Sequence, residues 1–242
     1  MNLRGKSCLI TGGSSGIGAA TVLALIDKGA HVAAFARRPP GVINEIASNV
    51  YYGTGDVARP EDCQRMIEET VSKIGGLDVL VHCAGGAAPG SLLNVTPEQW
   101  HRAFDVHLHS IFYLTRAAVP VMKARGGGAI VLISSVAGLR GVNGAIAYSV
   151  VKGAIPQFVR SMARELADDK ISVNAVTPGV IRTPFQDYLL PEQVQNNIEN
   201  RIPLHREGTP QDVAEAIVML IANDFITGES LTIDGGMSMR MV

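Results

Sequence analysis

The chain has 242 residues, of which 47% are hydrophobic and 18% charged, and its formal net charge at pH 7 is -1. This composition is typical of a folded globular protein, and it excludes a disordered chain and a basic domain that binds nucleic acid. No apolar run approaches the roughly 18 residues of a membrane-spanning helix, the N-terminus lacks a signal-peptide pattern, and three cysteines without metal spacing favour a reducing, cytoplasmic environment.

The first predicted strand, residues 7–10, leads into a glycine-rich turn and then into a helix through about Lys28. A glycine-rich turn between strand and helix lets backbone N–H groups approach a pyrophosphate, and the helix N-terminus adds favourable dipole charge. Isolated glycine clusters are usually plain turns, but here the strand and helix supply the required context. We therefore expect dinucleotide contacts from Gly12, Ser14, Ser15, Gly16, Ile17 and Gly18.

The second predicted strand, residues 31–36, ends at Ala36 and is followed by Arg37 and Arg38. An NAD site places an acidic residue at the end of this strand, where it binds the ribose hydroxyls. Ala36 offers no carboxylate to repel a 2′-phosphate, and the planar fork of an arginine matches phosphate geometry. This predicts that NADP(H) is favoured and that NAD(H) is also accepted. The alternative is that both arginines are solvated turn residues ahead of Pro39.

The middle of the chain continues the alternation of strands and helices. Strands are expected at residues 50–52 and 79–82, with a helix over 60–73 between them. Thr96, Pro97 and Gln99 have the spacing of a capping box that opens the next helix. That helical pattern continues toward Ala124, with a break expected near Asp105.

Residues 130–133 form an unbroken apolar run that predicts a strand buried on both faces of a parallel sheet. Ser134 and Ser135 follow at its end, where ligands bind in open α/β sheets. The next helix carries Tyr148 and Lys152, four residues apart and therefore on one face. A lysine cation beside a tyrosine lowers the pKa of the phenol from its ordinary value of about 10, so Tyr148 is a candidate acid or base.

The C-terminal part supplies the remaining elements. The helix that carries Lys152 runs to about Ala167 with Pro156 inside it, and a strand is expected at residues 172–176. Residues 185–205 have a mixed pattern, Thr209 caps a last helix, and residues 231–233 close the sheet. Strands alternating with helices predict an α/β fold, a doubly wound parallel sheet, with a single domain over residues 1–242.

A serine followed by Tyr-x-x-x-Lys, together with Thr-Gly-x-x-x-Gly-x-Gly near the N-terminus, resembles the short-chain dehydrogenase/reductase family over nearly the whole chain. The chain is similar to β-ketoacyl carrier-protein reductases and to sugar or alcohol dehydrogenases. The resemblance implies a Rossmann-like sheet of about seven strands with helices on both faces, and a homotetramer. It also implies that Ser135 binds the substrate oxygen, that Tyr148 moves the proton, and that Lys152 holds the nicotinamide ribose.

The resemblance implies further cofactor contacts. Asp56 and Val57 would lie against the adenine, although Asp56 could alternatively be a turn or cap residue. Cys83 replaces a family asparagine that supports the sheet, and a buried thiol is favoured there over a redox site. Ser15 stands where many NADP-preferring members carry a second basic residue, so the NADP preference is expected to be incomplete. The remaining contacts are expected from Cys83, Ala84, Gly85, Tyr148, Lys152, Pro178, Gly179, Ile181 and Thr183.

His107 aligns with a family asparagine that holds a water on the path between the lysine and solvent. We expect His107 to replace it in the proton relay, with activity responding to its ionisation near pH 6.5; the alternative is a histidine that only packs. His31, His101 and His205 are expected at the surface. No histidine pair has the spacing of a zincin, so no catalytic metal is predicted.

Residues within about 184–206 are expected to form the substrate lid, and the alternative is a pair of surface helices. Its apolar side chains favour a partly apolar substrate; they are Phe185, Tyr188, Leu189 and Leu190.

The leading hypothesis is an NAD(P)(H)-dependent oxidoreductase that interconverts a ketone and a secondary alcohol by hydride transfer. A second hypothesis is a non-catalytic protein that senses nicotinamide nucleotides, but intact Ser135, Tyr148 and Lys152 argue against it. A third is a lyase or epimerase acting on nucleotide sugars, which would need a substrate domain for which this chain is too short. The expected partner is thus a small carbonyl or alcohol, with neither nucleic acid nor membrane involved.

Overall fold

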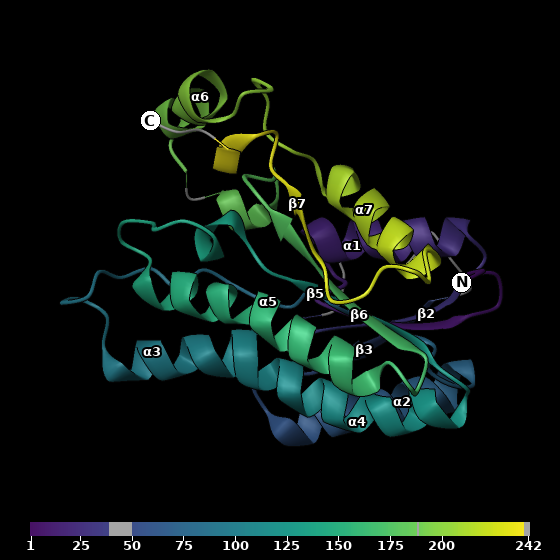
Figure 1. The fold of residues 1–242 in the computed structure, drawn as a ribbon. Helices are drawn as coiled ribbons and strands as arrows, with labels where there is room; N and C mark the ends of the chain where they lie inside the picture. Colours follow the sequence, from purple (N-terminus) through teal and green to yellow (C-terminus); the bar gives the residue numbers. More distant parts are fainter. Residues whose placement is uncertain (39–49, 188, 240–242) are drawn as a thin grey trace.

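The computed structural model describes residues 1–38, 50–187 and 189–239, and within them seven parallel strands form one sheet (Figure 1). The strands are β1 Ser7–Thr11, β2 His31–Ala36, β3 Val50–Thr54, β4 Val79–His82, β5 Gly128–Ile133, β6 Ile171–Pro178 and β7 Ser230–Ile233. Their order across the sheet is β3-β2-β1-β4-β5-β6-β7. Because the direction of winding reverses between β1 and β4, a crevice opens where those two strands end. The predicted doubly wound, Rossmann-like sheet is confirmed.

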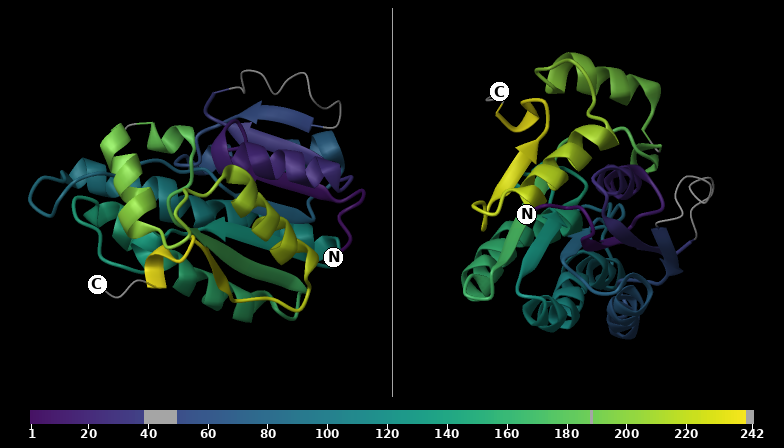
Figure 2. Two further views of the ribbon diagram at one scale, coloured as in Figure 1. Left: turned by 90° about the horizontal axis from the view of Figure 1, so that it is seen from above. Right: turned by 90° about the vertical axis from the view of Figure 1, so that its right-hand side faces the viewer.

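Helices cover both faces of this sheet. Figure 2 shows α1 and α7 on one face, and α2, α4 and α5 on the other. The helices are α1 Gly16–Asp27, α2 Pro60–Ile74, α3 Pro97–Phe104, α4 Ser110–Ala124, α5 Ile146–Leu166, α6 Pro191–Asn196 and α7 Pro210–Ala222. Within the described ranges, no helix has the length and apolar character needed to cross a membrane.

Alternate residues of the central strands face two separate cores. Leu9 and Leu80 pack in the core that α2, α4 and α5 cover, whereas Ile10 and Val81 pack in the core that α1 and α7 cover. Side chains alternate along a strand, so a strand buried on both faces is a continuous apolar run, as at residues 130–133. Each fully buried leucine or isoleucine contributes about 1.5–3 kcal/mol, so the sheet is a firm base for the loops at its edge.

The expected helix starts are present. Thr96 Oγ1 accepts the Gln99 N–H at 3.2 Å, and Gln99 Oε1 accepts the Thr96 N–H at 2.9 Å, which completes the predicted capping box. Thr209 caps α7 in the same way with Asp212.

The predicted break near Asp105 is a π-helical turn, Asp105–His109, that joins α3 to α4. The Ser110 N–H bonds the carbonyl of Asp105, five residues back. Such π-turns are rare in proteins, and many of those that occur lie at functional sites. This one carries His107, whose side chain is buried.

Candidate active site

The glycine-rich turn after β1 closes tightly against the loop after β4. Gly12 has a φ of 70°, and a Cβ there would lie 2.8 Å from the backbone nitrogen of Ala84. A Cβ on Gly18 would likewise strike the carbonyl oxygen of Gly12. The Ala84 N–H also donates to Thr11 Oγ1 at 3.3 Å. Only glycine permits this approach, which brings the two loops to one edge of the crevice.

The N-terminus of α1 is arranged for an anion. Its N-cap, Ser15, makes no side-chain bond to the helix, and the first helical bond runs from the Ala19 N–H to the Ser15 carbonyl at 3.1 Å. The N–H groups of the preceding residues therefore lack helical partners. Thr183 reaches this turn, since a Cβ on Gly16 would lie 3.1 Å from Thr183 Cγ2. A pyrophosphate fits the chemistry of this helix end.

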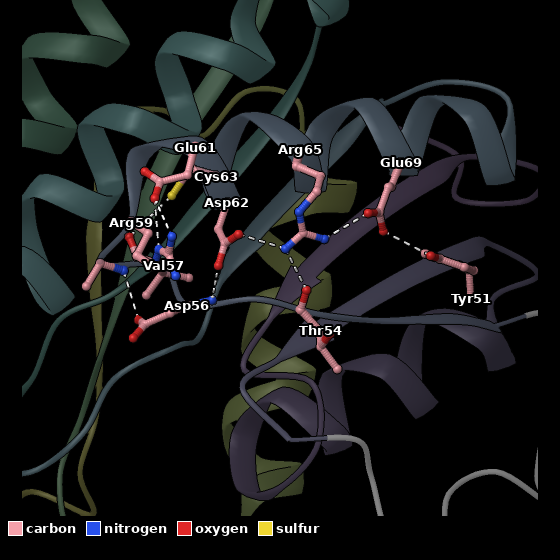
Figure 3. Close-up of polar contacts among 11 residues, drawn as sticks. Tyr51, Thr54, Asp56, Val57, Arg59, Glu61, Asp62, Cys63, Arg65 and Glu69 are labelled. Carbon is pink, nitrogen blue, oxygen red and sulfur yellow. Dashed lines mark hydrogen bonds and ion pairs between the residues drawn. The ribbon is translucent and has the colours of Figure 1, made fainter.

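The loop after β3 holds Asp56 by several polar contacts. The Asp56 N–H donates to the Asp62 carboxylate (Figure 3). The Asp56 carboxylate in turn accepts the Ala58 N–H at 3.0 Å. Asp56 Oδ2 pairs with the Arg102 guanidinium at 2.9 Å. Burial alone would raise the pKa of Asp56, but the Ala58 N–H and Arg102 outweigh it and hold the pKa below its ordinary value. The turn role weighed for Asp56 is therefore confirmed, and its adenine contact stays a prediction.

Arg102 was not anticipated from the sequence. It lies 46 positions from Asp56, and no local pattern links an arginine in the last turn of α3 to a loop after β3. Val57, beside Asp56, is buried, and its carbonyl accepts the Cys63 thiol.

Arg37 and Arg38 are exposed directly after β2. Neither forms an ion pair with any residue in the described part of the chain. The following turn, Pro39 and Pro40, lies outside the described residues. Both guanidinium groups are thus available to solvent or to a ligand.

Lys152 and Tyr148 share one face of α5, as their spacing predicts. Lys152 is buried, its Nζ donates to the Ile133 carbonyl at 2.7 Å, and it lies 5.7 Å from the centroid of the Tyr148 ring. Burial lowers the pKa of Lys152 to about 8. At neutral pH the ammonium therefore persists beside the phenol ring. Phe185 contacts the same ring, with centroids 6.2 Å apart.

The two serines after β5 have different environments. Ser134 is buried, and its hydroxyl donates to the Lys152 carbonyl at 2.9 Å. That carbonyl lacks its helical partner because Pro156, four residues on, has no N–H, which explains how α5 tolerates a proline deep inside it. Ser135 is half-buried, and its Oγ accepts the Ala137 N–H at 3.2 Å. The Ser135 hydroxyl thus keeps its own proton for a ligand, which supports the choice of Ser135 over Ser134.

His107 stands edge-on to Tyr148, with an interplanar angle of 88° and ring centroids 5.5 Å apart. Its Nε2 bonds the Gly86 carbonyl at 3.0 Å; a carbonyl only accepts, so Nε2 carries the proton. Nδ1 is a bare acceptor, buried and without a partner among the described residues. Burial, with help from the Lys152 charge, lowers the pKa of His107 to about 2. The expected titration near pH 6.5 is therefore wrong, because the desolvated ring stays neutral.

His82 joins the site to the sheet through a buried network that the sequence did not reveal. His82 Nδ1 lies 2.7 Å from Thr11 Oγ1, and Nε2 lies 3.0 Å from Ser110 Oγ. Ser110 gives its proton to the Val106 carbonyl at 2.8 Å, so it accepts from Nε2–H, and Thr11 donates to Nδ1. Burial lowers the pKa of His82 to about 3, so this ring too is neutral. The network ties β1 and β4 to the π-turn that carries His107.

Cys83 follows β4 as a free thiol, and burial raises its pKa to about 12. A thiol held in its protonated form fits the predicted packing role and not a redox one.

The loop after β6 is fixed on both sides. A Cβ on Gly179 would lie 2.7 Å from the Asp234 Cβ, next to the end of β7. Ile181 is buried and pairs with Gly208, whose N–H donates to the Val180 carbonyl at 2.9 Å. These contacts set the stretch from Pro178 to Thr183 against the N-terminus of α1.

The expected lid contains one short helix, α6, between a 3₁₀ turn at Pro184–Gln186 and a π-turn at Asn197–Arg201. It reaches the site through Phe185, whereas Tyr188 lies outside the described residues. The predicted surface positions of His31, His101 and His205 are confirmed.

Comparison with known proteins places the chain among oxidoreductases. A family model described as enoyl-(acyl carrier protein) reductase matches residues 12–238. The 3-oxoacyl-[acyl-carrier-protein] reductase FabG of Thermotoga maritima is 36% identical, over 98% of this chain and 99% of that protein. A short-chain type dehydrogenase/reductase from Mycobacterium ulcerans has a similar structure, with a TM-score of 0.91, 30% identity, and coverage of 99% and 92%. The structure of ElxO with NADP bound is also similar, with a TM-score of 0.88 and 32% identity over 97% of this chain and 99% of that chain.

Proposed function

The chain belongs to the short-chain dehydrogenase/reductase family, and we propose that Tyr148 exchanges the substrate proton in its reaction. The protein is an NAD(P)-dependent oxidoreductase that interconverts a ketone and a secondary alcohol. When bound, the nicotinamide supplies or accepts the hydride at the carbonyl carbon.

The observation that carries the proposal is the contact of Tyr148 with both Lys152 and His107. In reduction, the Tyr148 hydroxyl gives its proton to the carbonyl oxygen as negative charge develops there. The ammonium of Lys152, 5.7 Å from the ring centroid, stabilises the phenolate that remains. Ser135 donates its free hydroxyl proton to the same substrate oxygen. Oxidation of an alcohol follows the reverse path.

We keep His107 in the proton relay, as a neutral imidazole in place of the family asparagine. Its contact with Tyr148 and its buried, unpaired Nδ1 support this role. Because the ring does not charge, it would accept and donate hydrogen bonds without changing its own protonation.

The residues present fit a nicotinamide dinucleotide. The N–H groups at the start of α1, with Thr183 opposite, would hold the pyrophosphate, and the loop from Cys83 to Gly85 would border the adjacent ribose. Arg37 and Arg38, exposed and without ion pairs among the described residues, would hold the 2′-phosphate of NADP(H). The similar structure of ElxO with NADP bound supports this preference.

Substrate and assembly remain part of the proposal. Phe185 against Tyr148 offers an apolar wall beside the reacting oxygen, which favours a carbonyl with an apolar substituent. Phe112 on α4 and Val150 on α5 are exposed and apolar, which favours packing of these helices against a second copy in a tetramer. The free thiols of Cys8, Cys63 and Cys83 are consistent with a cytoplasmic enzyme.

Tyr148→Phe tests the proposal. We expect kcat to fall roughly 10²–10⁴-fold with the cofactor dissociation constant nearly unchanged, because only the exchangeable proton is lost. The assay is nicotinamide absorbance over a panel of ketones and alcohols, with cofactor binding measured separately. More than about a tenth of wild-type kcat in the variant would remove Tyr148 from the chemistry. A wild type that binds cofactor tightly but turns over no member of the panel would favour the nucleotide-sensing alternative.

A further inference from the structure

The loop between β3 and α2 and the first turn of α2 carry three acids, and each of them is paired with an arginine. Two of these pairs are drawn in Figure 3, and the third joins the loop to α3. The pairs are Glu61 with Arg59 (2.7 Å), Asp62 with Arg65 (2.8 Å) and Asp56 with Arg102 (2.9 Å). Arg37 and Arg38, which follow β2, form no ion pair within the described residues.

The pair of Asp56 and Arg102 differs from the other two. Glu61 and Asp62 are paired within α2 and its N-cap, whereas the partner of Asp56 comes from a different helix, α3. The pair is partly shielded on the acid's side, where the Asp56 side chain is 26% exposed against 49% for Arg102. Arg37 lies close enough for its charge to lower the pKa of Asp56, so Asp56 and Arg37 are electrostatic neighbours.

That proximity creates a conflict for a 2′-phosphate. A phosphate held by Arg37 would lie within the field of the Asp56 carboxylate, and like charges repel. A cation placed on Asp56 cancels that field without having to touch the phosphate. We propose that Arg102 is a specificity-determining residue for the 2′-phosphate: by neutralising Asp56 it leaves the charge of Arg37 and Arg38 to the ligand. This inference rests on the proposed binding of the adenosine beside Asp56.

The test is calorimetric binding of two cofactor fragments to the full chain. Adenosine 2′,5′-bisphosphate carries the 2′-phosphate and adenosine 5′-monophosphate lacks it. We expect Arg102→Gln to weaken binding of the bisphosphate about three- to tenfold and of the monophosphate less than about twofold, since the pair is partly exposed and screened. Arg59→Gln is the matched control: it also removes one positive charge, here from the N-cap of α2, but it unpairs Glu61 and leaves Asp56 paired. It should leave the affinity ratio within about twofold.

A second substitution distinguishes neutralisation of Asp56 by Arg102 from a direct contact between Arg102 and the 2′-phosphate. Adding Asp56→Asn to Arg102→Gln removes the uncompensated carboxylate while keeping an oxygen for the Ala58 N–H, so the affinity ratio should return to within about twofold of wild type. Failure of this rescue would show that Arg102 contacts the phosphate itself and would overturn the proposal. Equal weakening of both fragments by Arg102→Gln would overturn it as well, because Arg102 would then only anchor the loop.

The same titrations test the proposed NADP preference independently. The ratio of the two affinities in the wild type decides that preference, whereas the change of the ratio among variants decides the role of Arg102. A wild type without selectivity would therefore refute the first and leave the second to be judged on its own result.

Discussion

Two neutral histidines buried at the site should make the fold sensitive to mild acid. An exposed imidazole in the unfolded chain titrates near pH 6.5, whereas burial lowers the pKa of His107 to about 2 and of His82 to about 3. Between those values and pH 6.5, the two histidines are protonated in the unfolded state but not in the native state. Their contribution to the free energy of unfolding is therefore complete above pH 6.5 and is lost progressively as the pH falls below it.

The size of the effect follows from the same shift. At pH 5, about 1.5 units below the unfolded pKa, each histidine should cost about 2 kcal/mol relative to pH 7. The pair together costs about 4 kcal/mol, a large share of the roughly 5–15 kcal/mol that stabilises a typical domain. Among the described residues, the carboxyl whose pKa is lowered most is Asp212; its effect on stability acts at lower pH and does not mask this window.

Urea unfolding at pH 7 and pH 5 measures the effect. The wild type should lose free energy of unfolding between pH 7 and pH 5, and His107→Asn should make this loss smaller by about 2 kcal/mol, because the asparagine side chain does not titrate. His101→Asn is the control, since His101 is exposed, and it should leave the loss unchanged. If His107→Asn loses as much stability between pH 7 and 5 as the wild type, His107 is not held neutral by burial and the reasoning fails.

Three further predictions concern activity. Wild-type kcat/KM should favour NADP(H) over NAD(H) roughly ten- to hundredfold, and Arg37→Ala or Arg38→Ala should narrow the ratio, as loss of a charge-assisted bond of about 1.5–3 kcal/mol requires; an unchanged ratio in both variants would show that neither arginine reads the phosphate. Ser135→Ala should lower kcat about 10²–10³-fold with little change in the free energy of unfolding. Ser134→Ala should instead lower the free energy of unfolding by about 1–3 kcal/mol, because it leaves the buried Lys152 carbonyl without a hydrogen-bond donor. The reverse pattern in steady-state kinetics and urea unfolding would exchange the roles of the two serines. The pH–rate profiles of wild type and His107→Asn should keep one shape between pH 5 and 8 and differ only in height, and a wild-type inflection near pH 6.5 that the variant lacks would contradict a neutral His107.

Local patterns made most of the fold predictable. The apolar runs of the strands and the capping residues at Thr96 and Thr209 act over a few neighbouring positions, so the predicted ends of these elements agree with the structure to within one or two residues. The break near Asp105 was also visible, but its π-helical form was not, because one extra residue in a turn leaves no mark in residue type.

What the sequence could not supply are pairings between distant positions. His82 bonds Ser110 across 28 positions, and Asp56 pairs with Arg102 across 46. The ionisation of His107 was mispredicted for a related reason. A pKa depends on how completely a ring is desolvated and on which charges face it, and both are set by tertiary packing.

Lys152 shows how such pairings hold a charge in place without a carboxylate. Its Nζ donates to the carbonyl of Ile133, and its backbone carbonyl accepts the hydroxyl of Ser134. Two successive residues at the end of β5 thus hold the side chain and the backbone of the same lysine. The second bond exists because Pro156 removes the N–H that would otherwise occupy that carbonyl. A proline that costs a helical hydrogen bond thereby docks α5 onto the sheet at the residue whose position matters most. An acidic partner would hold the ammonium more strongly, but it would also cancel the positive field that Tyr148 requires.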